Sequence, residues 1–339
     1  MFLMVLSLLC LGSWASFFKF AGKWRFELFY LDFALGLMLA AVIYAFTVGN
    51  IGYDGFNFID DLQHAGKRQW MYVFIGGLIF NLGNMLLMAA VSVSGLAVAF
   101  PMGMGMALLL GTGLGIAGRP AGNGMLLALA CLLILASIIV NAASYRIMGV
   151  ARHEALARAG RAKSTRRPNP VKGIILALAA GLFLGAFAPL LDRARQGDLG
   201  LGPYALGAIF AFGVFYSSFV FDIFFMNLPV EGAPLEFGSY LRGGLRQHLS
   251  GLVSGVVWYA GILLAWMCSS VPESIQGEPA LRFGLAQGSP VVAALWGIVV
   301  FREFKGSDVR LKVLGMLMLV LFLCGVAMIG LAPLFLKKG

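Results

Sequence analysis

Charged side chains are scarce in this sequence. Asp, Glu, Lys and Arg make up 12% of its 339 residues, and hydrophobic residues make up 60%. Soluble domains contain about 25% charged and about 45–50% apolar residues, so a soluble globular fold is excluded. The charge-free runs 71–117 and 125–145 are each long enough for the roughly 20 residues that cross a bilayer as a helix. The sequence therefore predicts an all-α, multi-pass integral membrane protein.

The residues that usually form catalytic or metal sites are also few. The four cysteines, Cys10, Cys131, Cys268 and Cys324, each lie in an apolar run without metal-ligand spacing. The three histidines, His64, His153 and His248, fall in expected loops or at a helix end. No H-x-x-x-H pair, intramembrane aspartate pair or Ser/His arrangement is present. We expect no disulfide, metal, cofactor or enzymatic activity.

Hydropathy predicts about ten membrane spans. They lie near 2–18, 27–48, 70–91, 95–117, 122–146, 172–190, 203–227, 249–269, 278–300 and 310–334. The first run imitates a signal peptide, but it has no positively charged start, so we expect a retained helix.

The net charge of +10 does not indicate a nucleic-acid partner here, because basic loops of membrane proteins stay on the cytoplasmic side. The longest basic segment, 151–171, is predicted to be a cytoplasmic linker between two five-helix repeats, 1–150 and 172–339. Five helices before it would place both termini outside a cell membrane.

The two halves share an ordered series of similar segments. "LCLGSWA" at Leu9 resembles "LFLGAFA" at Leu182, and "ALG" occurs at Ala34 and at Ala205. Later pairs are Phe58 with Phe237, Leu62 with Leu241, Gly77 with Gly255, Gly83 with Gly261 and Gly111 with Gly297. Because five is an odd number, the second copy would enter the membrane in the opposite sense. This 5+5 inverted repeat is typical of transporters that work by alternating access.

Polar side chains within the spans are candidates for substrate contact, because they are costly in lipid. Asn81 and Asn84 share one helix face and could bind a substrate, or simply bond neighbouring helices. Trp258 and Tyr259 offer a stacking face and a hydroxyl, or ordinary packing. Gln287 and Ser289 precede Pro290, where a helix could open towards a ligand or merely kink.

Two aspartates are candidates for proton coupling. Asp222 lies about 9 Å from the predicted end of its helix, so burial would favour its protonated form and let it take up and release a proton. Asp32 is a weaker candidate of the same kind. Either could instead be an acid paired with a nearby base. Arg282, four residues after Glu278, suggests an ion pair at the outer mouth.

The segment "AFPMGMGMALLLGTGLG" at 99–115 lacks the third glycine of a phosphate-binding loop. Its glycines cannot all share one helix face, although Gly111 and Gly115 have the spacing of a homodimer contact. We expect a helix loosened by Pro101 that lies beside the transport site.

Several motifs together resemble the drug/metabolite transporter superfamily and, within it, the ureide permease family. They are "LCLGSWASFFK", "LDFALGLMLAAVIYAFTVGNIG", "FNFIDDL", "LGN" at Leu82, "FGSYL" at Phe237 and "SPVVAALWGIVVFREFKG" at Ser289. The resemblance covers nearly the whole chain. It implies a ten-helix bundle with a central cavity and proton-coupled import of ureides or nucleobase-like compounds.

The chain departs from the plant pattern of this family at Phe100 and Gly284, where that pattern has acids, and at Val257 and Trp258, where it has Gly-Asn. A sugar-uptake transporter or a metabolite or drug exporter of the same superfamily therefore stays open. A membrane scaffold or sensor is the alternative from another class, but it would need partner-binding domains outside the membrane. The expected partners are thus a small-molecule substrate, protons and the lipid bilayer.

Overall fold

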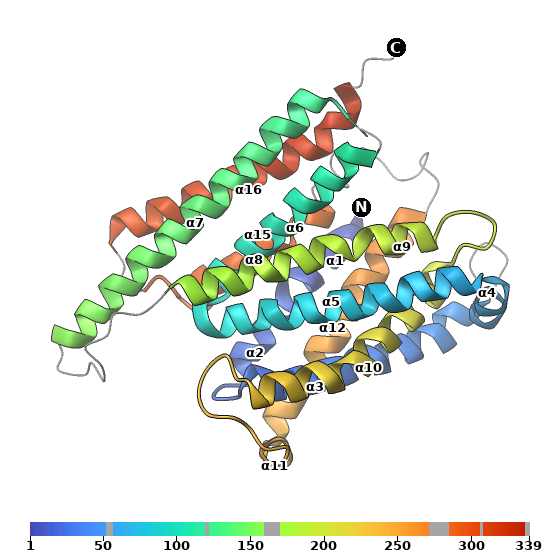
Figure 1. Cartoon of the computed structure of the whole chain (residues 1–339), viewed down its shortest axis with the longest axis horizontal. Coiled ribbons are helices and arrows are strands. Elements are labelled where there is room, and N and C mark those ends of the chain that lie inside the picture. The colour runs from blue at the N-terminus through green and yellow to red at the C-terminus, as the bar shows by residue number, and fades with distance from the viewer. Residues whose placement is uncertain (52–56, 119–121, 159–169, 271–284, 306–307, 336–339) are drawn as a thin grey trace. The chain divides into compact units, whose positions relative to one another are not determined.

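A computed structural model describes residues 1–51, 57–118, 122–158, 170–270, 285–305 and 308–335 (Figure 1). Every regular element in these ranges is a helix. Eight of the described helices are long and apolar enough to cross a membrane. Two shorter apolar helices, Phe2–Ser13 and Ser289–Val300, lie where the first and ninth spans are predicted. The structure is that of a multi-pass helical membrane protein, and the count of ten spans stays a prediction.

The chain divides into two compact units, each built from both sequence halves. Unit 1 comprises Met1–Met85 and Ala186–Glu278, and unit 2 comprises Leu86–Gly185 and Pro279–Gly339. The main helices of unit 1 are α1 (Phe2–Ser13), α2 (Ser16–Phe20), α3 (Phe26–Phe46), α4 (Phe58–His64), the first part of α5 (Lys67–Ser94), α9 (Ala188–Ala194), α10 (Pro203–Asn227), α11 (Gly238–Leu241) and α12 (Leu245–Ser270). A short turn of 3-10 helix, η1 (Val48–Asn50), follows α3.

Unit 2 holds the end of α5 and the remaining helices. These are α6 (Leu96–Gly118), α7 (Gly124–Arg158), α8 (Val171–Ala186), α15 (Ser289–Leu295), the π-helical η2 (Trp296–Val300), α16 (Val309–Leu331) and η3 (Ala332–Phe335). The green α7 and the red α16 lie side by side in Figure 1. The Ser137 hydroxyl joins them by donating to the Met318 carbonyl at 2.9 Å.

The predicted spans agree with most helices, and two differences stand out. The first span is interrupted at Trp14 and Ala15, which separate α1 from α2. Helix α7 continues to Arg158 rather than ending near 146, so 151–158 begin the predicted linker as helix. Ala, Leu, Glu and Arg in this stretch are strong helix formers. The rest of the linker lies outside the described residues.

Unit 1 is held together by two helix pairs whose backbones meet at glycines. On α5, a Cβ at Gly77 would lie 2.6 Å from the Phe210 carbonyl oxygen and 3.2 Å from the Gly213 Cα of α10. On α12, a Cβ at Gly255 would collide with the Phe33 carbonyl and with the backbone of Gly36 on α3. Small residues permit this approach between membrane helices, whose association cannot rely on the hydrophobic effect.

These two contacts use matching positions in the two halves. Phe33 and Gly36 face Gly255 in the way that Phe210 and Gly213 face Gly77. Phe33 and Phe210 are 177 positions apart in the sequence, and so are Gly36 and Gly213. Gly77 and Gly255 are the pair that the sequence comparison also gives. For α3 and α10, however, the contacts match Phe33 with Phe210, whereas the sequence comparison aligned Ala34 with Ala205, 171 positions apart.

The glycine-rich helix α6 packs with different glycines against different neighbours in unit 2. A Cβ at Gly103 would lie 3.2 Å from the Ala177 carbonyl oxygen of α8, and one at Gly105 would lie 3.1 Å from Ile138 of α7. Gly111 has open space. The structure thus agrees that these glycines do not form one face, and the homodimer contact stays a prediction.

The start of α6 is capped by a carboxylate from far along the chain. Glu303 accepts the backbone N–H groups of Leu96 at 3.0 Å and Ala97 at 2.9 Å. Gly95, with a φ of +88°, makes the turn from α5 into α6 that leaves room for this carboxylate. Free N–H groups at a helix start need such acceptors, especially in an apolar setting.

Candidate functional site

Helices α3, α5 and α10 enclose a buried polar cluster in unit 1. The amide nitrogen of Asn81 donates to the Ser217 hydroxyl at 2.8 Å, the Ser218 hydroxyl at 3.1 Å and the Val214 carbonyl at 3.1 Å. Its carbonyl oxygen accepts from the Tyr30 hydroxyl at 2.9 Å. Asn81 is fully buried, and these bonds tie the three helices together. In this structure Asn81 therefore bonds neighbouring helices, which is the alternative to substrate binding that the sequence left open.

Tyr30 connects the two asparagines that share a face of α5. Its hydroxyl donates to Asn81 and accepts from the Asn84 amide nitrogen at 3.1 Å. A buried hydroxyl with both functions in use holds its neighbours in fixed orientations. Tyr30 is therefore the centre of this cluster.

Asp222 lies on α10, one helical turn beyond Ser218. Its side chain is 1% exposed, and neither carboxylate oxygen has a hydrogen-bond partner among the described residues. Its electrostatic neighbours include Glu27 and Tyr30 on α3. Glu27 itself pairs with Arg25 at 2.5 Å. Asp222 is thus a buried acid that lacks the compensating bonds such groups normally have.

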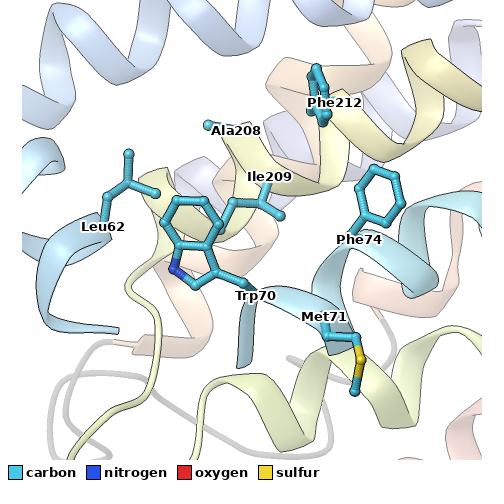
Figure 2. Close-up of a pocket in the computed structure, with 7 residues that line it drawn as sticks. All are labelled: Leu62, Trp70, Met71, Phe74, Ala208, Ile209 and Phe212. Atoms are coloured by element: carbon cyan, nitrogen blue, oxygen red, sulfur yellow. The ribbon is translucent and has the colours of Figure 1, made fainter. Parts of the chain in front are cut away.

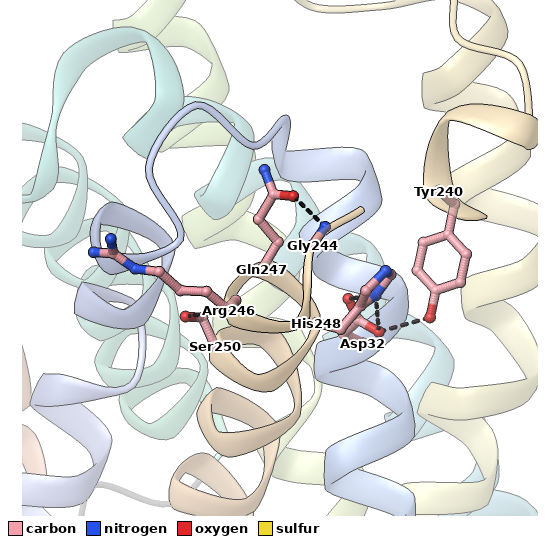
Figure 3. A network of polar contacts seen from close by, with 7 residues as sticks. All are labelled: Asp32, Tyr240, Gly244, Arg246, Gln247, His248 and Ser250. Atoms are coloured by element: carbon pink, nitrogen blue, oxygen red, sulfur yellow. Dashed lines mark hydrogen bonds and ion pairs between the residues drawn. The ribbon is translucent and has the colours of Figure 1, made fainter. Parts of the chain in front are cut away.

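Asp32 is also buried, at 2% exposed, but both of its carboxylate oxygens have hydrogen-bond partners (Figure 3). The Tyr240 hydroxyl of α11 donates to Oδ1 at 2.6 Å. Nδ1 of His248 on α12 lies 2.9 Å from Oδ2 and 3.1 Å from Oδ1. Burial, together with the bond to Asp32, raises the pKa of Tyr240 well above its usual value, so this hydroxyl stays a donor. Asp32 is thus an acid paired with a nearby base, which is the alternative to proton coupling that the sequence left open.

Trp258 and Tyr259 lie in an aromatic core of unit 1. The Trp258 ring stacks on Phe210 with centroids 5.9 Å apart and lies 4.5 Å from Phe80. Tyr259 is fully buried, and its hydroxyl has no partner among the described residues. Packing against other aromatic rings explains why Trp258 is buried. The described residues do not explain why the Tyr259 hydroxyl is buried without a partner.

The remaining predicted site residues belong to unit 2. Gln287 ends a short helical stretch, Gly288 interrupts it, and the buried Ser289 starts α15 with Pro290 in its first turn. A break therefore occurs beside Pro290, as expected. Pro101 does not break its helix, because α6 runs through it to Gly118. Neighbouring groups can satisfy the one carbonyl that a proline frees in a membrane helix.

The predicted residues therefore fall into separate groups. Asn81, Asn84 and Asp222 border the Tyr30 cluster, and Asp32 forms its own network. The ion pair expected between Glu278 and Arg282 lies outside the described residues. Sequence reasoning missed Tyr30, Ser217, Ser218, Tyr240 and His248 as members of the site. The serine pair in "YSSFVFD" gave a usable signal, since two adjacent hydroxyls are unusual within an apolar span.

Comparison with known proteins agrees with the expected resemblance. The ureide permease family profile matches residues 29–145. The chain is 23% identical to ureide permease 1 and 26% identical to ureide permease 2 of Arabidopsis thaliana, over 96% of this chain and 95% of each relative. Over 98 residues, it is 36% identical to ureide permease 3 of the same plant.

A solved crystal structure aligns with 99% of this chain and 98% of its own chain. The TM-score is 0.51 and the sequence identity is 16%, so the two proteins are similar in fold alone. The relatives named above are permeases, which are transporters rather than enzymes. The chain is therefore a multi-pass membrane protein that resembles the ureide permeases over nearly its whole length.

Proposed function

We propose that this chain is a proton-coupled secondary active transporter of a small ureide-like or nucleobase-like compound. Similarity to ureide permeases and eight apolar helices support a membrane transporter of ureide-like compounds. The finer proposal depends on the buried carboxyl of Asp222 beside the Tyr30 cluster, which has no hydrogen-bond partner among the described residues.

The substrate would be recognised by the amides of Asn84 and Asn81 and by the Tyr30 hydroxyl. Ureides and nucleobases present alternating N–H donors and carbonyl acceptors, and a side-chain amide offers the complementary pair. Among the described residues Asn84 has one hydrogen bond, to Tyr30, whereas Asn81 has five. Asn84 is thus the better placed of the two to exchange a bond within the protein for one to a substrate. Trp258, Tyr259, Gln287 and Ser289 remain proposed substrate contacts.

The proton would bind to Asp222. A charged carboxylate without hydrogen bonds is costly in an apolar interior, and a bound proton removes that cost. Tyr30 responds electrostatically to Asp222 and bonds both asparagines, so the charge on Asp222 would bias the substrate contacts. Asp32 is the second proposed proton carrier, and its pairing makes it the weaker one.

Alternating access would use the two sequence halves as an inverted repeat. Supporting this, the backbone contact of Gly77 with Phe210 and Gly213 matches that of Gly255 with Phe33 and Gly36. The positive charge of the 151–171 segment supports a cytoplasmic linker with both termini outside.

Uptake into proteoliposomes tests this proposal. We expect the wild-type protein to accumulate radiolabelled allantoin or uracil when given an inward-directed proton gradient. Asp222→Asn should lose at least tenfold of this accumulation yet still exchange substrate across the membrane, because only the proton site is removed.

Asp60→Asn is the matched control, since Asp60 is an exposed acid on α4. It should accumulate substrate like the wild type. Full gradient-driven accumulation by Asp222→Asn would refute the coupling role. Failure of a broad panel of ureides, nucleobases and sugars to enter would refute the transport proposal itself.

A further inference from the structure

An apolar groove of about 440 Å³ opens on unit 1 between α4, α5 and α10 (Figure 2). Trp70 is 40% exposed and its indole lies across the middle of the groove, beside Ile209. The volume lies in the range of small-molecule sites, and the lining is apolar throughout. The lining residues are Leu62, Trp70, Met71, Phe74, Ala208, Ile209 and Phe212.

The groove lies near the first residues of two membrane-spanning helices. Helices α5 and α10 start at Lys67 and Pro203, and the Gly66 N–H donates to the Leu199 carbonyl at 3.3 Å just before them. At 1.5 Å per residue, the groove extends from about 5 Å to about 14 Å along the two helices. Tryptophan is enriched at that level, where the bilayer interface passes into the hydrocarbon. An occupant would therefore enter from the bilayer interface and be apolar at its inner end.

A basic residue stands at the outer end of the groove. Lys67 precedes Trp70, Met71 and Phe74 by three, four and seven residues, which places all four on one face of α5. Lys67 is exposed, and no ion pair joins it to another residue in the described part of the chain. The nearby carboxylate of Asp61 is already engaged, because it accepts the Gly202 N–H at 3.0 Å. A free ammonium group one turn outside an apolar groove is complementary to a phosphate attached to a hydrocarbon chain.

We propose that this groove binds one acyl chain of an anionic phospholipid, whose phosphate pairs with Lys67. The spanning helices place the groove within the bilayer, and the stripe of Lys67, Trp70, Met71 and Phe74 matches the order of headgroup, interface and chain. The site is separate from the Tyr30 cluster and does not depend on which solute the protein carries.

Quenching of tryptophan fluorescence tests the proposal. Phosphatidylglycerol with brominated acyl chains is titrated into the detergent-solubilised full-length protein, since bromine quenches an indole that it touches. We expect saturable quenching that is largely absent in Trp70→Phe. Lys67→Gln should weaken the apparent affinity about fivefold, because one basic residue near the surface contributes about 1 kcal/mol towards anionic lipid.

Arg68→Gln is the matched charge control, because it removes the same charge from the same turn on a different helix face. It should change the affinity less than twofold. An equal loss in both variants, or equal quenching by brominated phosphatidylcholine, would overturn the role of Lys67 and reduce the groove to a non-specific lipid contact.

Filling the groove gives a second test. Ala208→Phe should abolish the saturable quenching, whereas Val220→Phe should not, since Val220 is 62% exposed on the same helix and outside the groove. Unchanged lipid affinity in a folded Ala208→Phe protein would show that the chain does not occupy this groove.

Discussion

Asp32 on α3 and Asp222 on α10 are two buried acids of unit 1, and their hydrogen-bond partners differ. Asp32 accepts from Tyr240 and pairs with His248, so its charge is compensated. Asp222 has no hydrogen-bond partner among the described residues, and its electrostatic neighbours include another acid, Glu27. The two acids are thus almost equally buried, but only the charge of Asp32 is compensated by described partners. The partners of a buried acid, rather than its depth, indicate whether it fixes structure or is free to change its charge.

The largest expected difference between the two acids is in stability. Asp32→Asn should lower the free energy of unfolding by roughly 2 kcal/mol, because it removes charged hydrogen bonds to Tyr240 and His248. Asp222→Asn should cost less than about 0.5 kcal/mol or be stabilising, because no hydrogen bond is lost. Denaturant titration of both variants in the same detergent measures this. Similar losses at the two positions would mean that the pairing seen at Asp32 contributes little.

The same contrast exists between two fully buried tyrosines and offers a smaller test. Tyr30→Phe removes a hydroxyl that bonds Asn81 and Asn84, and should destabilise the protein by about 1–2 kcal/mol. Tyr259→Phe removes a hydroxyl without a partner in the described residues, and should be neutral or stabilising. Thermal unfolding of the two variants side by side is the measurement. Destabilisation by Tyr259→Phe would reveal a partner for that hydroxyl.

Asp61 on α4 is a third acid, and its substitution should have the smallest effect on stability. That effect is measured as a change of stability with pH. Burial raises the pKa of Asp61 above 3.8, against the opposing hydrogen bond from Gly202. The folded protein therefore holds this proton more tightly than the unfolded chain does. Its contribution to stability is complete below pH 3.8 and is lost as the pH rises through the folded pKa.

Wild-type protein should accordingly lose stability relative to Asp61→Asn as the pH is raised from about 4. Unfolding temperatures of both proteins across this range test the sign. A constant difference between them would mean that Asp61 titrates alike in the folded and unfolded chains.

Much of the polar cluster could be predicted from the sequence, because an amide or a carboxyl group stands out in an apolar span. Asn81, Asn84 and Asp222 were identified in this way. Tyr30 could not be, since a tyrosine in such a span is as often a packing residue as a polar one. The partners of Asp32 were also out of reach, because Tyr240 and His248 are 208 and 216 positions away.

The helices were more predictable than their arrangement. Helix α10 has the predicted bounds, 203–227, because Pro203 starts it and the apolar run ends at Asn227. The division into two units that each mix the sequence halves depends on contacts between distant segments, which hydropathy does not encode. Helix α6 runs through Pro101 over nearly the predicted span, 95–117.

At Gly36 and Gly255, and again at Gly77 and Gly213, main chain rests on main chain with no side chain between. Each contact joins a helix of the first half to a helix of the second. A Cβ at any of these four positions would collide with a backbone carbonyl of the facing helix, so even alanine there would force the two helices of unit 1 apart.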